Sequence, residues 1–385
     1  MAEREREARP MPGGADGQVV TGAELRQRFR GAASSGGCWT APDTEPRVLS
    51  DGELEFFRVE GYIVLEGLMD HDLCRRAVDG IFACAGATGL RLDQNDPSTW
   101  MNPFQPEDED EENEGNYVST GIGHRWHLRE VGGEELIVSL LPRRCLAIAQ
   151  QLVGDSVAFP SGGEPTAQRT AALQSCFAPN GRRCRGVYSS FPAYRRAVPP
   201  NERVPLRDQP DRGHYDTQAL DDSMTPARFM ATGLLGDTPP GCGGFTVFPR
   251  SHRRLHQLAS ECRDKGINPV SAEGTARRDA LVEEIAADTE PVDCFGPAGT
   301  VVLWHRATMH KVATNYSQAI RFGCIYDFLS SEQLGNGQAW DTLGLHADAW
   351  EQQRGWVGPA PALWERWRGD GGLRIGTREE QTARL

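Results

Sequence analysis

The stretch GTVVLWHRATMHKVATNYSQAIRF, residues 299–322, is the most informative part of this sequence. It opens with an apolar run after a glycine, a pattern typical of a buried β-strand. The Thr-Asn-Tyr segment at residues 314–316 favours a turn, after which the chain can return as a second strand. Arg321 follows His310 by eleven residues, so both side chains can face one cavity.

The same strand pattern extends outward from this stretch over about 170–330. Short apolar runs lie between Gly and Pro turns in ARFMATGLLGD (227–237), GGFTVFPRSH (243–252) and RFGCIYDFL (321–329). These runs predict the strands of an antiparallel sandwich or barrel. One run of helical spacing, 276–287, interrupts them.

The N-terminal half is predicted to be mostly helical. Ser50 and Glu53 form a capping box, so we expect a helix from about Asp51 that ends at Gly61. A strand (YIVLEGL, 62–68), a helix (72–84) and an amphipathic helix (134–153) should follow. Helices first and strands later predict an α+β domain with helices packed on a β core.

Two ends and one insertion are expected to lie outside this core. Residues 1–47, rich in Gly, Ala, Arg and Pro, are predicted to be a mobile or loosely docked arm, with a single domain over 48–385 and a C-terminal extension at 331–385. The acidic segment EDEDEENE, 107–114, favours a solvated loop over a cation or partner patch.

Composition excludes several classes of function. The formal net charge of −13 over 385 residues argues against nucleic-acid binding and against docking on anionic membranes. No apolar run is long enough for a transmembrane helix, and no secretory signal is visible, so a cytoplasmic location is expected. The alternative is peroxisomal, through the terminal Ala383-Arg384-Leu385. Ten scattered cysteines without a C-x-x-C pair predict reduced, buried thiols and no zinc framework.

The segment RGHYDTQ, 212–218, supplies candidate metal ligands. His214 and Asp216 are two residues apart, so on an extended segment both side chains point to the same side. Two imidazoles and one carboxylate on one side of the metal suit a non-haem ferrous site. His305 or His310 can provide the third ligand.

Arg321 has a chemical use in such a site. Its planar guanidinium binds a carboxylate through two parallel hydrogen bonds, so it can anchor a dicarboxylate whose other end chelates iron. An ordinary ion pair is the alternative. His124 and His127 are expected either to line the pocket or to be structural, and His252 to stabilise a turn.

In order and spacing, these motifs resemble the phytanoyl-CoA dioxygenase-like family of Fe(II)/2-oxoglutarate oxygenases. The resemblance runs from about 56 to 328, over FFRVEGYIVLEGLM, HYD (214–216), LLGDTPPGCGG, FTVFPRSH and the 299–322 block. It implies a double-stranded β-helix (jelly-roll, cupin-like) core with packed N-terminal helices. The sequence departs from the family in having Arg250 where the Pro-Gly-Ser-His turn has glycine, and a long segment between Gln174 and His214.

The resemblance also implies roles for particular residues. It implies that iron is bound by His214, Asp216 and His310, and that Arg321 binds the far carboxylate of 2-oxoglutarate. More loosely, it implies cosubstrate contacts for Gln174 and Thr232. The implied cofactors are Fe(II), 2-oxoglutarate and O2, with ascorbate as a supporting reductant.

The implied activity is oxidation of an unactivated C–H bond in a small molecule. The carboxylate of Asp216 favours hydroxylation, desaturation or ring closure over halogenation. The arginine-rich segment 182–212 suggests a substrate bearing carboxylate or phosphate, or else a loop paired with acids. The competing hypotheses are a non-catalytic metal-binding scaffold or sensor, and a zinc hydrolase.

Overall fold

The computed structural model describes residues 22–33, 49–85, 90–101, 117–119, 124–128, 131–132, 134, 136–137, 140, 148, 186–215, 227–268 and 271–329. The helices are α1 (Gly22–Ala33), α2 (Asp51–Glu60), α3 (His71–Ala85), α7 (Ser251–Asp264) and α8 (Ala272–Asp288), with short 3-10 helices η2 (Pro97–Trp100), η4 (Pro200–Glu202) and η5 (Leu206–Asp208). The strands are β1 (Tyr62–Leu65), β2 (Tyr117–Ser119), β3 (His124–Leu128), β4 (Val187–Ser190), β5 (Ala227–Leu234), β6 (Phe245–Val247), β7 (Val292–Cys294), β8 (Val301–His305), β9 (His310–Val312) and β10 (Arg321–Leu329).

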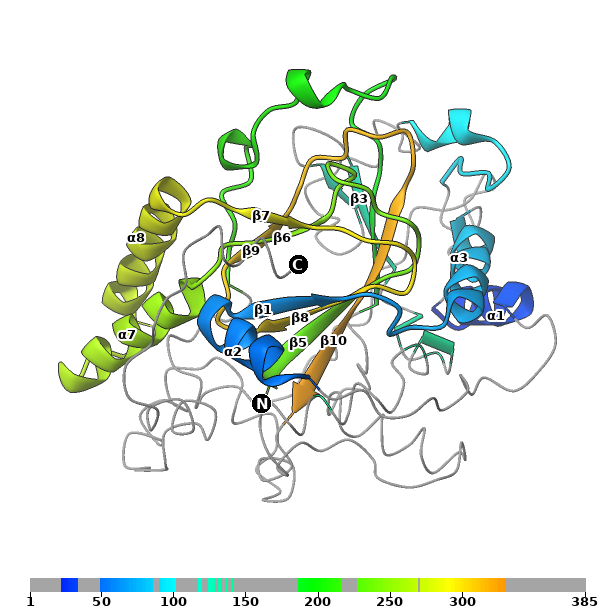
Figure 1. The fold of residues 1–385 in the computed structure, drawn as a ribbon. Helices are drawn as coiled ribbons and strands as arrows, with labels where there is room; N and C mark the ends of the chain where they lie inside the picture. Colours follow the sequence, from blue (N-terminus) through cyan, green and yellow to red (C-terminus); the bar gives the residue numbers. More distant parts are fainter. Residues whose placement is uncertain are drawn as a thin grey trace, which may run out of the picture.

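Two antiparallel sheets form the centre of the molecule (Figure 1). The larger sheet has seven strands in the order β1-β8-β5-β10-β4-β3-β2, and the smaller has three in the order β7-β6-β9. A cluster of buried side chains joins them, with Met230, Val302 and Trp304 from the large sheet and Phe245 and Val247 from the small one. The mixture of helices with antiparallel sheet matches the predicted α+β class.

Alternate side chains of the large sheet point to opposite faces, and both faces bury apolar residues. Residues directly opposite each other in an antiparallel pair share a face, so the registers divide the strands into two sets. The face that bears Trp304 and Met230 points to the small sheet and is called the inner face here. The other face carries Ile63, Leu303 and Cys324, which join the core beneath α1 and α3.

Helix α2 and strand β1 form as the sequence predicts. The Ser50 hydroxyl accepts from the Glu53 N–H, and the Glu53 carboxylate accepts from the Ser50 N–H, which completes the capping box. Gly61 ends the helix in the left-handed region at φ 83°. A side chain at Gly61 would also meet the His252 ring, so glycine is needed twice over at this position.

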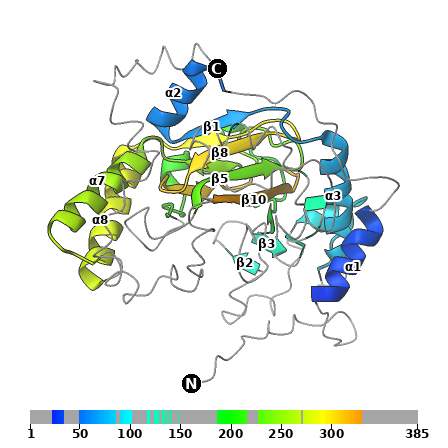
Figure 2. The ribbon, with the colours of Figure 1, turned by 90° about the horizontal axis from the view of Figure 1, so that it is seen from below.

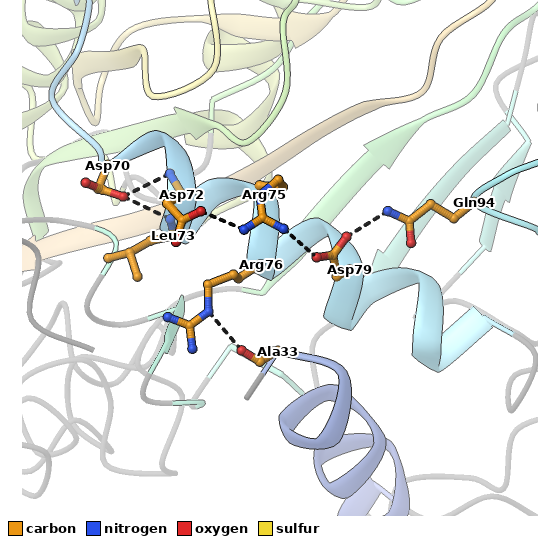
Figure 3. Close-up of polar contacts among 8 residues, drawn as sticks. All are labelled: Ala33, Asp70, Asp72, Leu73, Arg75, Arg76, Asp79 and Gln94. Atoms are coloured by element: carbon orange, nitrogen blue, oxygen red, sulfur yellow. Dashed lines mark hydrogen bonds and ion pairs between the residues drawn. The ribbon is translucent and has the colours of Figure 1, made fainter. Parts of the chain in front are cut away.

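Within the arm that was predicted over 1–47 to be mobile or loosely docked, residues 22–33 form helix α1. Its Leu25, Phe29 and Ala33, spaced by four, are buried against α3. The buried Arg76 side chain donates to the Ala33 carbonyl at 3.0 Å, which satisfies the end of α1 (Figure 3). Asp70 caps α3 by accepting from two backbone N–H groups. The Gly- and Arg-rich composition hid this apolar stripe.

Helices α7 and α8 pack together on the side of the sheets away from α1 and α3 (Figure 2). The run 276–287 belongs to α8, as predicted, but α7 was not expected, because the Pro-Arg-Ser-His segment 249–252 was predicted only as a turn. His252 therefore lies in the first turn of α7, fully buried, with Nε2 3.2 Å from the Arg58 carbonyl oxygen.

The predicted strand runs 227–237, 243–252, 299–310 and 321–329 contain β5, β6, β8 and β10, but β6 ends at Val247 and β8 at His305. The pairing of the strands also differs in one respect. The segments on either side of the 314–316 turn do not pair with each other, because β9 belongs to the small sheet and β10 to the large one.

Three of the predicted features lie mostly or wholly outside the described residues: the helix 134–153, the acidic segment 107–114 and the extension 331–385. Among the described helices, none has the length and apolarity needed to cross a membrane.

Candidate functional site

His214 and His310 lie side by side at the edge of the small sheet. An isolated antiparallel bridge joins them, with the His214 N–H 2.9 Å from the His310 oxygen and the reverse bond at 3.0 Å. Their ring centroids are 4.6 Å apart. Opposed residues in such a pair point to the same side, and His310 is opposite the inward-facing Val247. Both imidazoles therefore face the space between the sheets.

The His310 ring is held by aromatic neighbours and by one carbonyl. The rings of Trp304 and Phe245 lie 4.4 Å and 5.2 Å from it, centroid to centroid. Its Nδ1 lies 3.0 Å from the Thr308 oxygen, an atom that can only accept. The neutral ring thus carries its proton on Nδ1 and its lone pair on Nε2, as a metal-binding histidine often does.

His305 lies on the other side of the large sheet. Trp304 faces inward, so the next residue of β8 faces outward. His305 Nδ1 accepts from the Ala307 N–H at 3.1 Å, and its ring centroid is 5.4 Å from that of His252. Of the two candidates for the distal ligand, only His310 lies beside His214.

Two predicted site residues, Asp216 and Gln174, lie outside the described residues. The described part of the chain brings no three His, Cys, Asp or Glu side chains together as a metal site. A third ligand for the His214 and His310 pair would therefore come from the rest of the chain, where Asp216 follows His214 by two positions.

Arg321 is a buried cation on the inner face, at the start of β10. Its Nε donates to the Gly243 oxygen at 2.8 Å and its Nη1 to the Tyr188 oxygen at 3.0 Å. None of the ion pairs between described residues involves Arg321. Burial, with a smaller effect of the nearby Arg125, lowers its pKa to about 10, while Asp293 opposes this shift. Arg321 thus stays charged at neutral pH, and a guanidinium with five donors retains some for a ligand.

Thr232 shares this inner face. It lies opposite Ile325 on β10, which is on the same side as Arg321. Its hydroxyl accepts from the Trp304 indole N–H at 3.1 Å. Since the Trp304 ring also contacts His310, one side chain links the predicted cosubstrate residue to the predicted ligand.

Sequence analysis missed part of this face. Arg125 on β3 lies opposite Ser190, which lies opposite Arg321, so the three form a row across the sheet. Arg125 Nη2 donates to the Asp211 carboxylate and to the Val312 oxygen, both at 3.1 Å. The signal was the alternation in HRWHL (124–128), where Trp126 and Leu128 are buried in the outer core.

His127, which was expected either to line the pocket or to be structural, is on the inner face with its ring 4.4 Å from that of Tyr188. The side chain of His124 lies outside the described residues.

The arginine-rich segment is described from residue 186 onward and divides into two kinds of side chain. Arg203 donates to the Val198 and Pro240 oxygens, and Arg207 pairs with Glu290 at 2.9 Å. Arg195, Arg196 and Arg212 are exposed. Two of these arginines are therefore used in holding the loop, as expected of a structural segment.

No family model matches this sequence, and no curated protein matches it either. Among solved structures, this one is similar to EctD from S. alaskensis with bound Fe: 16% identity over 74% of this chain and 79% of that chain, with TM-score 0.41. It is also similar to HygX from Streptomyces hygroscopicus with nickel and 2-oxoglutarate bound: 15% identity, 74% and 88% coverage, TM-score 0.37.

A third similar structure is SnoK, a non-haem alpha-ketoglutarate-dependent carbocyclase from nogalamycin biosynthesis: 17% identity, 77% and 87% coverage, TM-score 0.32. Similarity this low establishes neither the fold family nor the activity of this chain.

Proposed function

We propose that this chain is an Fe(II)- and 2-oxoglutarate-dependent oxygenase with a double-stranded β-helix core of the phytanoyl-CoA dioxygenase-like type. The observation that carries the proposal is the contact between His214 and His310 at the edge of the small sheet. The bridge adds the His214 segment to the order β7-β6-β9, so four segments face the large sheet. Facing antiparallel sheets with this order support a jelly-roll core.

The donor set fits a ferrous ion. His214 and His310 would each give one imidazole nitrogen, and Asp216 would give the carboxylate of a two-histidine, one-carboxylate site. The Thr308 carbonyl fixes the His310 tautomer so that Nε2 is the donor. When bound, the iron would supply the oxidation chemistry, in which dioxygen and 2-oxoglutarate become succinate and carbon dioxide while a substrate C–H bond is oxidised.

Arg321 fits the far carboxylate of 2-oxoglutarate. Its guanidinium is buried, donates to two carbonyl oxygens, and has no ion-pair partner among the described residues. A dicarboxylate would therefore bring the carboxylate that no described ion pair gives to Arg321. Thr232 would lie along the same face, while Trp304 and Phe245 would exclude water from the reacting end.

The substrate is proposed to be a small molecule that enters from the exposed side of His214. The exposed Arg195, Arg196 and Arg212 favour one that carries carboxylate or phosphate. The proposed location is the cytoplasm, or the peroxisome if the terminal Ala383-Arg384-Leu385 acts as an address.

The proposal is tested on protein purified without oxygen. Addition of Fe(II) and 2-oxoglutarate is expected to give the weak visible absorption of an iron chelate, and oxygen should then give succinate. His310→Ala should lose both signals, whereas the matched His305→Gln should keep them, because His305 faces away from the inner space.

Arg321→Leu separates the cosubstrate site from the metal site. We expect the KM for 2-oxoglutarate to rise about ten-fold or more, as loss of a charge-assisted hydrogen bond predicts, with Fe(II) affinity unchanged. Iron binding without chelate absorption or succinate would contradict the proposal and favour a scaffold. Zinc binding with hydrolysis would favour a hydrolase.

A further inference from the structure

The segment 206–214, here called the approach segment, leads the chain to His214 without a continuous strand. Its one turn of regular structure is η5, and the bridge to His310 is an isolated pair rather than part of a ladder. Two backbone hydrogen bonds alone fix a residue weakly. The orientation of His214 therefore depends on what holds the approach segment.

Lys311 holds the approach segment from the small sheet. It follows His310 directly on β9, so its side chain points to the opposite face. There its Nζ donates to the Asp211 oxygen at 2.8 Å and also to the Leu206 oxygen. Lys311 is 1% exposed, so these carbonyls replace water around a buried ammonium.

Arg125 holds the same segment from the large sheet. Its Nη2 donates to Asp211 Oδ2 and to the Val312 oxygen. Both partners of the ion pair are mostly buried, at 17% and 29% side-chain exposure. One guanidinium thus ties the edge of β9 to the approach segment.

Arg125 and Lys311 both donate hydrogen bonds to Asp211. Its backbone oxygen accepts from Lys311, its Oδ2 from Arg125, and its Oδ1 from the Gly213 N–H at 2.9 Å. The last bond fixes the Arg212–Gly213 peptide, one residue before His214. Every group that holds Asp211 is on β3, on β9 beside His310, or next to His214.

We propose that Asp211, clamped between Arg125 and Lys311, is the positioning residue that sets His214 against His310. The inference goes beyond the two-histidine, one-carboxylate ligands and rests on the proposed function only for its metal readout. Asp211 does not touch the metal; it acts through the peptide of Gly213. Outer groups of this kind alter metal affinity about 10- to 100-fold when removed.

The test compares Asp211→Ala with Asp208→Ala. Asp208→Ala removes a carboxylate from the same segment, but the Asp208 side chain is exposed. Hydrogen exchange of the metal-free protein reports on positioning directly, because the His214 N–H donates to His310. We expect Asp211→Ala to exchange faster over residues 206–215 by about ten-fold or more, and Asp208→Ala to match the parent protein.

Co(II) affinity, measured by titration without 2-oxoglutarate, is expected to fall about ten-fold or more in Asp211→Ala and to stay unchanged in Asp208→Ala. Arg125→Leu should behave like Asp211→Ala, and Arg125→Lys should restore part of the affinity. If Asp211→Ala does not fold, Asp211→Asn and Arg125→Leu are measured in its place, and both should still bind Co(II) more weakly.

The clamp is overturned if folded Asp211 and Arg125 variants show parent-like exchange and parent-like Co(II) affinity. Failure of the proposed function looks different. In that case the parent protein itself would bind no Co(II), or His310→Ala would bind it equally well, while the exchange experiment would still decide whether Asp211 positions His214.

Discussion

At the scale of single residues, Gly213 shows how closely the backbone is constrained at the site. It has φ 90°, and a Cβ there would lie 2.9 Å from Phe248 Cε2, 3.0 Å from Met309 Cε and 3.2 Å from the His310 oxygen. Any L side chain would thus be strained and would push against the strand that carries His310.

We expect Gly213→Ala to cost about 1–3 kcal/mol of stability and to weaken Co(II) binding as well. The matched control is Gly67→Ala, since Gly67 has φ 64° but nothing within 4 Å of its added Cβ. Both variants should lower Tm, and only Gly213→Ala should lower metal affinity. Equal metal affinities in the two variants would contradict this account.

The residue scale also shows what sequence could and could not provide. Histidines at 214 and 310 were expected at one metal, and the structure places them together, although their role as ligands stays a prediction. Arg125 and Asp211 were missed because their contact joins residues 86 positions apart, one on the large sheet and the other in the approach segment. The spacing of a motif predicts which side chains are close within one strand or turn. The contact between Arg125 and Asp211 depends instead on how distant segments pack together.

At the scale of elements, the turn into α7 contains a residue that sequence marked as unusual. Arg250, in place of glycine, has φ 66°, which explains why glycine suits this turn. Its side chain binds both oxygens of the buried Glu60, with Nη2 at 2.8 Å. The ion pair offsets the strain of the backbone.

We therefore expect Arg250→Gly to be more stable than Arg250→Ala by about 1 kcal/mol, because both lose the ion pair but only alanine keeps the left-handed strain. Arg277, inside α8, is the control: there glycine should be about 1 kcal/mol worse than alanine. Denaturant unfolding measures both pairs. The same order at both positions would contradict the explanation.

Helix α1 offers a second prediction for an element. Phe29 is buried against Gly80 of α3, where an added Cβ would lie 2.6 Å from its ring. We expect Phe29→Ala to destabilise the protein by about 3–5 kcal/mol, and the exposed Gln27→Ala to change stability little. Similar unfolding curves for the two variants would mean that α1 is not packed against α3.

Strands β2, β3, β4 and β7 and the helices α1 and α7 were not predicted from the sequence. Helix α1 lies in a Gly-, Ala- and Arg-rich region, and α7 starts within a polar turn without acidic residues in its first turn. By contrast, both ends of α2 were predicted, because Ser50, Glu53 and Gly61 act locally. Tertiary burial, which sequence does not display, decided α1 and α7.

At the scale of the whole molecule, the described cysteines are all free and buried: Cys74, Cys84, Cys242, Cys262, Cys294 and Cys324. Burial, helped by the nearby Asp70, raises the pKa of Cys74 to about 12. Burial also raises the pKa of Cys294. The thiols of Cys74 and Cys294 are therefore protonated at pH 8, and all six are enclosed, so they should not react.

A thiol reagent at pH 8 is therefore expected to modify none of these six in the native protein, and all ten cysteines of the chain after unfolding. Peptide mass mapping identifies the modified positions, and a sample treated first with reductant is the control. Rapid modification of Cys74 in the native protein would show that the core beneath α3 opens.

Trp304 is placed so that its fluorescence should report on metal binding. Its indole is fully buried, donates to Thr232 and lies against the imidazole that we propose as the distal ligand. A transition-metal ion at that imidazole would quench the emission of this tryptophan before any turnover takes place. Metal occupancy of the site could then be followed by tryptophan fluorescence in the absence of substrate.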